Sequence, residues 1–335
     1  MRYLSTFTGI GGFELGINKA YENIWKSRQQ GRLEGVRDMS NLERNGQDEQ
    51  YPSCIGFSEI DKYAIATYQS HFPEHHNYGD TTKINEQELP DFDMLVGGFP
   101  CQAFSIAGKR GGFDDTRGTL FFDCARILKE KQPRNFILEN VKGLLSHDNG
   151  RTFATIINTL TELGYCVEWQ VLNAKNFGVP QNRERVFIVG HLGGIPERKV
   201  FPITRTDRES NETSGVQSVS NPRELSRTLL ARDYKDPKVV QVADYRNDEG
   251  LRIRSEPISP CLSARRHSET DISTMTNFII KPETRIRRLT PLECERLMGY
   301  PDGWTEGLSD TQRYKTLGNG IVSNVVAEVV KKLYL

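Results

Sequence analysis

One cysteine lies in a setting that could make it a nucleophile. Cys101 follows the apolar run 94–96 and stands among Gly98, Pro100 and the polar Gln102 in the stretch GGFPCQAFSIAG. Glycine and proline at the end of a predicted strand favour an exposed, rigid turn, whereas an inert cysteine usually lies among apolar residues. Only a small fraction of a free thiol is ionised at neutral pH, so attack by Cys101 would need positive charge or helix-end amides nearby.

Charged and polar side chains also follow or precede two later strands. Glu139 directly follows the apolar run NFIL, at the carboxyl end of a strand, where doubly wound folds collect their chemistry. Helix capping by Glu139 or Asn140 is the alternative interpretation. Gln181, Arg183 and Arg185 alternate along the chain into the next strand and so share one face. Such a face needs an anionic partner, either a phosphate or a carboxylate of a ligand, or it forms a structural salt-bridge cluster.

A third group of residues could bind a nucleotide-like ligand. The sequence FTGIGG at 7–12 stands between a predicted strand and a predicted helix, where glycines let backbone N–H groups approach a ligand. The dinucleotide fingerprint GxGxxG is not met, because Glu14 stands at its third glycine, which favours a different adenosine-containing cofactor. Glu59 follows the second strand, where an acid can bind ribose hydroxyls, and Asp80 stands at the next turn. Surface positions or helix caps are the alternatives for both acids.

These side chains require a scaffold that brings strand ends together. Apolar, β-prone runs recur at 2–8, 54–57, 94–96, 136–138 and 186–189, and helical patterns lie between them at 13–25, 120–131 and 151–163. Strands alternating with helices predict an α/β fold with a parallel, doubly wound sheet. A turn and an amphipathic, valine-rich helix at 318–335 are expected to pack on the core.

Two stretches depart from this alternation. Residues 26–50 are polar and nearly free of large apolar residues, which predicts an exposed insertion of unassigned function. From about 191 to 284, Pro, Ser, Thr, Arg and Asp dominate, which predicts a second, less regular lobe. Within it the pattern SxxLxAR occurs at 226–232 and 259–265, either as a structural duplication or by coincidence.

Composition restricts the class of protein. The chain has 335 residues, 36% apolar and 26% charged, with a mean hydropathy of −0.56, so no membrane span is expected. Its six cysteines are scattered without a CxxC pair, which argues against a metal site and a disulfide framework. The N-terminus lacks the layout of a signal peptide, and a cytoplasmic protein is expected. Residues 175–288 carry 21 Lys and Arg against 15 Asp and Glu, which is compatible with a polyanionic partner.

Six short blocks occur in a fixed order along the chain: FTGIGG, GFPCQ, ENVKG, QNRER, RRLTPLECERLMGYPDGW at 287–304 and YKTLGNGI at 314–321. Together they resemble the ordered motifs of the DNA cytosine-5 methyltransferases, above all the compact bacterial and phage enzymes of restriction-modification systems. The resemblance covers about 1–190 and 285–335. It implies a Rossmann-like S-adenosylmethionine-dependent methyltransferase domain at 1–190, completed by 305–335, and a smaller, irregular, β-rich target-recognition domain at 191–304.

The resemblance also implies roles for individual residues. S-adenosyl-L-methionine would be bordered by Phe7, Gly9, Gly11 and Asn319, with Glu59 on the ribose hydroxyls and Asp80 on the adenine amino group. Cys101 would be the nucleophile that attacks a flipped-out cytosine, Glu139 the carboxyl at its ring nitrogen 3, and Arg183 and Arg185 the residues that position the base and its phosphates. Gln102, Arg232 and Arg265 are the candidates for DNA contacts, the two arginines because arginine commonly reads guanine edges.

The partner implied is double-stranded DNA, bound by a monomer, and any cognate restriction endonuclease would be a separate protein. Ile60 departs from the family, which usually has tryptophan after the ribose-binding acid, so the cofactor face can be packed differently. Three other functions stay open at this point: an RNA (tRNA) cytosine-5 methyltransferase, a DNA-binding protein without catalysis, and an NAD-dependent oxidoreductase. Intact Cys101 and Glu139 argue against the second.

Overall fold

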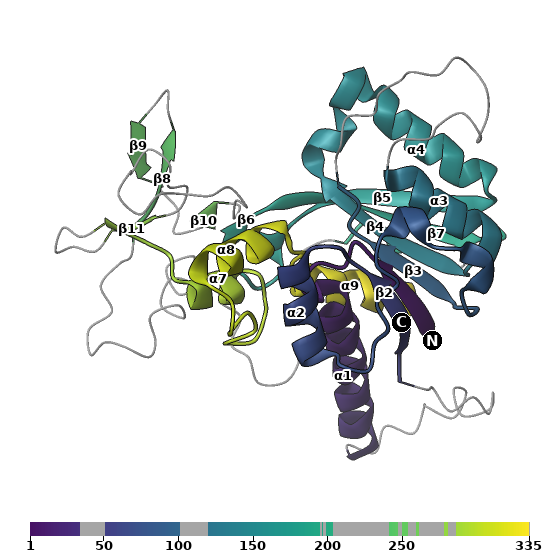
Figure 1. The fold of residues 1–335 in the computed structure, drawn as a ribbon, viewed down its shortest axis with the longest axis horizontal. Coiled ribbons are helices and arrows are strands. Elements are labelled where there is room, and N and C mark those ends of the chain that lie inside the picture. The colour runs from purple at the N-terminus through teal and green to yellow at the C-terminus, as the bar shows by residue number, and fades with distance from the viewer. Residues whose placement is uncertain are drawn as a thin grey trace.

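The computed structural model describes residues 1–33, 51–100, 120–194, 196, 199–203, 241–246, 250–253, 259–260, 278–280 and 286–334. Its centre is a six-stranded sheet, with helices on both faces (Figure 1). The strand order is β2-β1-β3-β4-β7-β5. The strands are β1 (Arg2–Thr6), β2 (Ser53–Ser58), β3 (Met94–Gly97), β4 (Asn135–Val141), β5 (Tyr165–Asn173) and β7 (Glu184–Leu192).

The sheet is mixed, which corrects the expectation of a wholly parallel one. Strands β2, β1, β3 and β4 pair in parallel, but β7 runs antiparallel to both β4 and β5. The reason is the short connection 174–183 between β5 and β7, because a parallel pair needs a longer crossover, usually with a helix. As a result, the first residues of β7 lie at the same sheet edge as the last residues of β4, with Arg185 opposite Val141.

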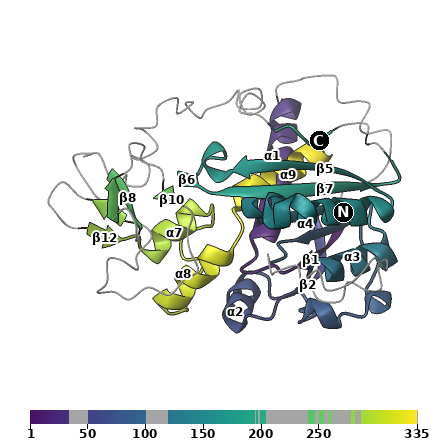
Figure 2. The ribbon, with the colours of Figure 1, turned by 90° about the horizontal axis from the view of Figure 1, so that it is seen from above.

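Alternating side chains of the strands form two hydrophobic layers, one on each face of the sheet. Helices α3 (Leu120–Lys131) and α4 (Arg151–Glu162) cover one face, and α1 (Gly12–Leu33) and α9 (Ser323–Tyr334) cover the other (Figures 1 and 2). The α3/α4 layer includes Leu95, Phe136, Leu138, Ile188, Phe121, Leu128, Ile156 and Leu160. The α1/α9 layer includes Met94, Val96, Ile137, Val189, Phe13, Ile17, Val325, Val326 and Val329.

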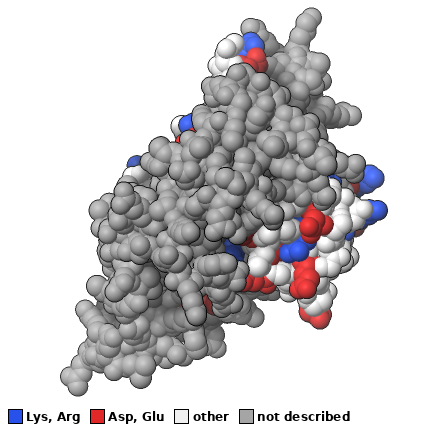
Figure 3. Space-filling model, turned by 90° about the vertical axis from the view of Figure 1, so that its left-hand side faces the viewer, with Lys and Arg blue, Asp and Glu red and all other residues white. Residues whose placement is uncertain are grey.

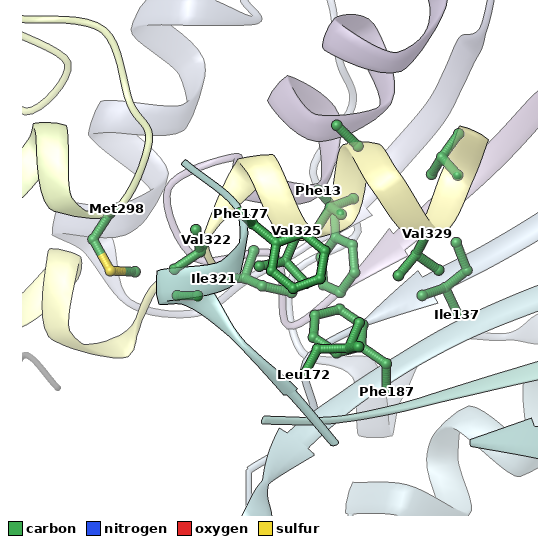
Figure 4. Close-up of a cluster of buried hydrophobic side chains, with 14 of the residues drawn as sticks. Phe13, Ile137, Leu172, Phe177, Phe187, Met298, Ile321, Val322, Val325 and Val329 are labelled. Carbon is green, nitrogen blue, oxygen red and sulfur yellow. The ribbon is translucent and has the colours of Figure 1, made fainter. Parts of the chain in front are cut away.

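Helix α9 lies against the sheet, as its apolar pattern predicts. Figure 4 shows Val325 and Val329 directed toward Phe187 and Ile137 of the strands. On its other side α9 approaches α1 closely at Gly16, where an added Cβ would come within 2.5 Å of the Val326 Cβ. The small residue therefore sets the distance between the two helices.

The C-terminal part of the chain adds further elements to this core. Helix α2 is Lys62–His71, α7 is Pro291–Leu297 and α8 is Asp310–Asn319. Leu297, Tyr300 and Trp304 are buried in the α1/α9 layer, although the sequence placed 191–304 in the second domain. Trp304 donates from Nε1 to the Ile10 carbonyl at 2.8 Å and stacks on His71 with ring centroids 3.6 Å apart.

A second, smaller sheet lies to one side of the main body (Figure 1). Its order is β12-β11-β8-β9, formed by β8 (Gln241–Arg246), β9 (Gly250–Ile253), β11 (Phe278–Ile280) and β12 (Ile286–Arg288). A short parallel pair, β10 (Ser259–Pro260) with β6 (Gln181–Asn182), connects this region to the approach to β7. These strands agree with the β-rich lobe expected from the sequence. Most of the SxxLxAR repeat lies outside the described residues.

Several element bounds differ from the sequence-based expectations. Helix α3 has the predicted bounds, and α4 ends one residue earlier than predicted. Helix α1 continues to Leu33, so the first part of the expected insertion 26–50 is helical; residues 34–50 lie outside the described residues. Strand β5 was not predicted. None of the helices in the described ranges combines the length and the apolar character needed to cross a membrane.

Candidate active site

A cavity of about 470 Å³ opens at the sheet edge where β1, β2, β3 and β4 end. Its size is typical of small-ligand sites. Its walls come from segments far apart in the sequence. The lining residues are Phe7, Gly9, Ser58, Glu59, Ile60, Gly79, Asp80, Thr81, Gly98, Phe99, Pro100, Leu120, Glu139, Asn140, Val141, Arg183, Arg185, Gly318 and Asn319.

Most of the site residues expected from the sequence meet in this cavity. Those that line it are Phe7, Gly9, Glu59, Asp80, Glu139, Arg183, Arg185 and Asn319. Cys101, Gln102, Arg232 and Arg265 lie outside the described residues, and their roles stay predictions. Pro100, the last residue before Cys101, lines the cavity.

Gly11 does not line the cavity. Its φ is +86°, and an added Cβ would come within 2.8 Å of the Phe72 ring and 3.3 Å of the Tyr68 ring. Glycine is therefore required here by the turn and by the close approach of α2, since other residues rarely adopt this φ. Gly11 therefore shapes the FTGIGG turn through this close packing, and its expected place beside a cofactor stays a prediction.

The loop after β2 presents Glu59 in a fixed orientation. Its Oε2 accepts a hydrogen bond from the Gly9 N–H at 2.9 Å, which connects the β1 and β2 loops. Its Oε1 accepts from the N–H groups of Ile60 and Asp61 at 2.8 and 2.9 Å. A carboxylate has about four lone-pair sites, so Glu59 keeps acceptor capacity toward the cavity. Ile60 beside it is 72% exposed and offers an apolar surface at the cavity wall.

The next loop carries Asp80 at the start of the 3₁₀ turn Thr81–Lys83. Its Oδ1 accepts from the Thr82 N–H at 3.0 Å and from the Thr82 hydroxyl at 2.8 Å. These hydrogen bonds lower the pKa of Asp80, so it stands as an ionised acceptor. The buried Thr81 hydroxyl lies 2.6 Å from the Ser58 hydroxyl, which joins this loop to the end of β2.

Two glycines in the cavity lining, Gly9 and Gly79, leave open space near the loops that carry Glu59 and Asp80. Both have positive φ values, +58° and +75°, and an added Cβ at either would meet no atom within 4 Å. Phe7 and Ile60 add apolar surface to the same cavity, whose wall also carries the carboxylates of Glu59 and Asp80. Hydrogen-bond acceptors beside an apolar surface suit a nucleoside, whose ribose hydroxyls and amino group donate.

Glu139 and Arg185 form an ion pair in the lining of the same cavity. Arg185 Nε lies 3.1 Å from Glu139 Oε1, and both side chains are largely buried. Burial raises the pKa of Glu139 above its ordinary value, although Arg185 and Arg183 act in the opposite direction. A carboxyl group with a raised pKa can hold a proton and donate it to a ring nitrogen. Arg185 therefore has an anionic partner within the chain, the structural salt bridge that the sequence analysis gave as an alternative to a ligand.

Gln181 and Arg183, which alternate with Arg185 along the QNRER block, also contact protein groups. Arg183 is 3% exposed and donates from one terminal nitrogen to the carbonyls of Gly318 and Gly320, at 3.2 and 2.7 Å. Gln181 is buried and donates to the Leu297 carbonyl at 2.9 Å. Arg183 thus fixes the end of α8, which carries Asn319 to the cavity, onto the approach to β7.

Asn140 is a site residue whose role the sequence interpretation missed. It is 2% exposed, and its Nδ2 donates to the Phe99 carbonyl at 2.9 Å while its Oδ1 accepts from the Val141 N–H at 2.8 Å. It does not cap a helix, because the following 3₁₀ turn begins after Val141 without a side-chain cap. The signal was its place in the ENVKG block directly after Glu139. Asn140 holds the chain at Phe99, two residues before Cys101.

Charge is mixed on the described part of one face of the molecule. In Figure 3, basic and acidic side chains lie next to one another on the described part of the face shown. Lys142, just beyond the cavity residue Val141, pairs with Glu184 at 2.9 Å. Most of the net-basic interval 175–288 lies outside the described residues, above all the part that follows β7. The expected basic lobe therefore stays a prediction.

Comparison with known proteins agrees with this arrangement. The family described as C-5 cytosine-specific DNA methylase matches residues 1–335. Type II methyltransferase M.HhaI of Haemophilus parahaemolyticus is 35% identical over 335 residues, covering 97% of this chain and 92% of that protein. Type II methyltransferase M1.ScrFI of Lactococcus lactis subsp. cremoris is 41% identical over 283 residues, covering 82% of this chain and 70% of that protein.

The fold is also found among solved structures. The crystal structure of the S. pombe Dnmt2 methyltransferase superposes with a TM-score of 0.65 at 15% identity, covering 99% of this chain and 97% of that one. The family match covers the full chain, and curated relatives are more than 30% identical to it, so the similarity indicates family membership and not only a shared fold. The chain belongs to the family of C-5 cytosine-specific DNA methylases.

Proposed function

We propose that this DNA cytosine-5 methyltransferase transfers a methyl group from S-adenosylmethionine to carbon 5 of a flipped-out cytosine in a short duplex DNA sequence. The observation that carries the proposal is one cavity whose lining includes both the acids Glu59 and Asp80 and the Glu139–Arg185 pair. A site of this kind can hold a nucleoside cofactor and a pyrimidine ring side by side.

One group of residues in this lining fits S-adenosylmethionine. Glu59 would accept from the ribose hydroxyls, Asp80 from the adenine amino group, and Phe7 with Ile60 would flank the adenine. The openings at Gly9 and Gly79 admit the nucleoside. The carboxylates also favour the cationic sulfonium group, which supplies the methyl group to be transferred. Asn319 at the end of α8 would close the site from the C-terminal side.

A second group of residues, Cys101, Glu139 and Arg185, would overcome the low nucleophilicity of carbon 5 of cytosine. Cys101, as the thiolate, would add to carbon 6 while Glu139 donates a proton to ring nitrogen 3, so that the ring becomes an enamine whose carbon 5 can take up the methyl group. Methyl transfer would leave S-adenosylhomocysteine. A water molecule would then take the proton from carbon 5, so that the double bond between carbons 5 and 6 re-forms, the bond from carbon 6 to Cys101 breaks and the thiolate is regenerated, while ring nitrogen 3 returns its proton to Glu139. Arg185 would keep Glu139 oriented, and its guanidinium can also bind the base or a neighbouring phosphate.

Both faces of a stacked base are covered, so the cytosine has to leave the helix. Base flipping costs a few kcal/mol, which protein contacts must offset. Target recognition is assigned to the region 191–304, with Gln102, Arg232 and Arg265 as the candidate DNA contacts. Replacement of Arg232 by alanine is expected to relax or shift the methylated motif if Arg232 reads a base, and to weaken all sites equally if it contacts phosphate.

The relatives named type II methyltransferases suggest that this protein protects DNA in a restriction-modification system, with any endonuclease being a separate protein. The test is bisulfite sequencing of plasmid from a host without its own cytosine methylation, expressing either the wild-type protein or Cys101→Ser. Protection of one cytosine in a recurring motif, lost in the variant, is the expected result.

Absence of protection by soluble wild-type protein that binds S-adenosylmethionine would refute a DNA substrate, and methylation of tRNA by the same preparation would then identify an RNA substrate. Normal protection by Cys101→Ser would refute the covalent mechanism while leaving DNA methylation in place. Cofactor binding by the variant, measured separately, shows that its fold is intact.

A further inference from the structure

Arg126 on helix α3 connects that helix to the loop that carries Asp80. One terminal nitrogen of its guanidinium donates to the Ile84 carbonyl at 2.7 Å and pairs with Glu86. The other donates to the Thr81 carbonyl at 3.0 Å and lies 3.4 Å from Asp123 on the same helix. A planar guanidinium with several fixed donors can hold two carbonyls of one loop at once.

The loop held in this way forms a wall of the cavity. Thr81 lines the cavity, is 3% exposed and contacts the Ser58 hydroxyl, and Asp80 precedes it directly. Arg126 itself does not line the cavity, and its side chain remains 31% exposed. Its effect on a ligand must therefore pass through the backbone that it holds.

We propose that Arg126 is a positioning residue for the cofactor: by fixing the carbonyls of Thr81 and Ile84, it sets the position of the Asp80 carboxylate toward the adenine. The inference rests on the proposed binding of S-adenosylmethionine in this cavity. Without the guanidinium, the 3₁₀ turn 81–83 keeps its own hydrogen bonds, and Ile84 still packs in the α3/α4 layer, but the turn loses its hydrogen bonds to Arg126 on α3. The ligand must then order the loop on binding, which lowers its affinity.

Helix α3 provides a matched control for this effect. Lys131, near the end of the helix, also donates to a carbonyl of the connection between β2 and β3, that of Leu89 at 2.9 Å, and pairs with Asp91 at 2.7 Å. Neither Leu89 nor Asp91 lines the cavity. Lys131→Ala therefore removes the same kind of attachment from the same connection without reaching the cavity wall.

The experiment measures binding of S-adenosylhomocysteine by calorimetry to the wild-type protein, Arg126→Ala, Arg126→Lys and Lys131→Ala. Arg126→Ala is expected to bind about tenfold more weakly than wild type, and Lys131→Ala to change affinity by less than about threefold. Arg126→Lys is expected to fall between, because an ammonium can reach one carbonyl but cannot hold both. Thermal unfolding of each unliganded variant reports the loss of stability separately.

Steady-state kinetics separates positioning from general damage. Arg126→Ala is expected to raise KM for S-adenosylmethionine while kcat at saturating cofactor and KM for DNA stay near wild type. If Arg126→Ala and Lys131→Ala weaken binding equally, or if kcat falls as much as the affinity, the proposal is overturned although the proposed function stands. If the wild-type protein itself does not bind S-adenosylhomocysteine, the proposed function fails and this inference fails with it.

Discussion

Asn140 offers a sharp test of how the site is assembled, because one buried amide holds the chain that leads to the expected nucleophile. Its Nδ2 donates to the Phe99 carbonyl at 2.9 Å, and its Oδ1 accepts from the Val141 N–H at 2.8 Å. Asn140→Ala removes both bonds. Asn140→Asp keeps the acceptor for Val141 but replaces the donor by a carboxylate oxygen that faces the Phe99 carbonyl.

The expected loss of stability follows from burial. Asn140 and Phe99 are each 2% exposed, so the Phe99 carbonyl would lose a partner that water does not readily replace. Leaving one buried group without its hydrogen bond costs about 1–3 kcal/mol, and Asn140→Ala is expected to lose about that amount of unfolding free energy. This is less than the total stability of about 5–15 kcal/mol of a typical protein, so the variant stays folded.

Asn140→Asp adds a dependence on pH with a defined sign. Burial and the facing carbonyl raise the pKa of the introduced carboxyl in the folded state, because only its protonated form can donate to Phe99. The stability that this proton supplies is present below the unfolded pKa of about 3.9 and is lost as pH rises through the folded pKa. The deficit relative to wild type is therefore expected to grow from acidic to neutral pH.

Activity is expected to fall more than cofactor affinity. A displacement of the segment before Cys101 by about 1 Å can reduce turnover about 100-fold, whereas the loops that carry Glu59 and Asp80 make no hydrogen bond to Asn140 and are expected to stay in place. The assays are urea unfolding at several pH values, calorimetric binding of S-adenosylhomocysteine and transfer of labelled methyl groups to DNA. Asn158→Asp, at an exposed position of α4, is the control. Wild-type turnover by a measurably destabilised Asn140→Ala would show that the Phe99 contact does not position the nucleophile.

Three further perturbations test other parts of the molecule. Glu139→Gln is expected to slow methyl transfer strongly. In the wild type kcat is expected to fall as pH rises through the raised pKa of Glu139, because the protonated acid is the active form, and the variant is expected to lose this pH dependence. A pH profile identical to wild type would exclude this role. Gly190→Ala is expected to cost about 1–3 kcal/mol in urea unfolding, because its Cβ would come within 1.9 Å of the Phe136 ring, and unchanged stability would contradict the packing described. Burial raises the pKa of Glu14 in the folded state, so the wild type loses stability as pH rises above the unfolded pKa of about 4.3, whereas Glu14→Gln does not. The variant is therefore expected to gain stability relative to wild type with rising pH. A difference in unfolding free energy between the two proteins that is independent of pH would show that Glu14 is not held protonated.

Much of the scaffold could be predicted because its elements carry local signals. Helix α3 was predicted with its observed bounds, and α9 packs on the sheet through the valines that identified it. Strand β5 was missed because it lies at the edge of the sheet and Glu168, Trp169 and Gln170 interrupt its apolar pattern. Such a strand is specified by its pairing with β7 rather than by its own composition.

The orientation of β7 could not be predicted from alternation alone. In a wholly parallel sheet, Arg185 at the start of its strand would lie at the edge opposite Glu139 at the end of its own. Because β7 runs antiparallel to β4, Arg185 and Glu139 lie at the same edge of the sheet, with Arg185 Nε 3.1 Å from Glu139 Oε1. Short connections therefore carry information about the site that a pattern of strands and helices does not.

Single-residue contacts across the sequence were the least predictable. Glu59 after β2, Asp80 at a turn and Glu139 near the end of β4 were proposed from their places beside strand ends and turns, and all three line the cavity. Asn140 and Arg126 act through carbonyls of distant loops, and no spacing in the sequence indicates such a partner. The close approach of Tyr68 and Phe72 to Gly11 is a contact of the same kind, which the motif around Gly11 does not indicate.

The attachment of the end of α8 by Arg183 has a consequence for synthesis of the protein. Gly318 and Asn319 form part of the cavity wall, and Arg183 holds the carbonyls of Gly318 and Gly320. A nascent chain that has emerged from the ribosome only as far as β7 can begin to fold, since domains form from the N-terminus as they appear. It still lacks this wall of the cavity. The cavity is therefore complete only after residue 320 has emerged, and a shorter translation product would lack part of the wall as well as the carbonyls that Arg183 holds.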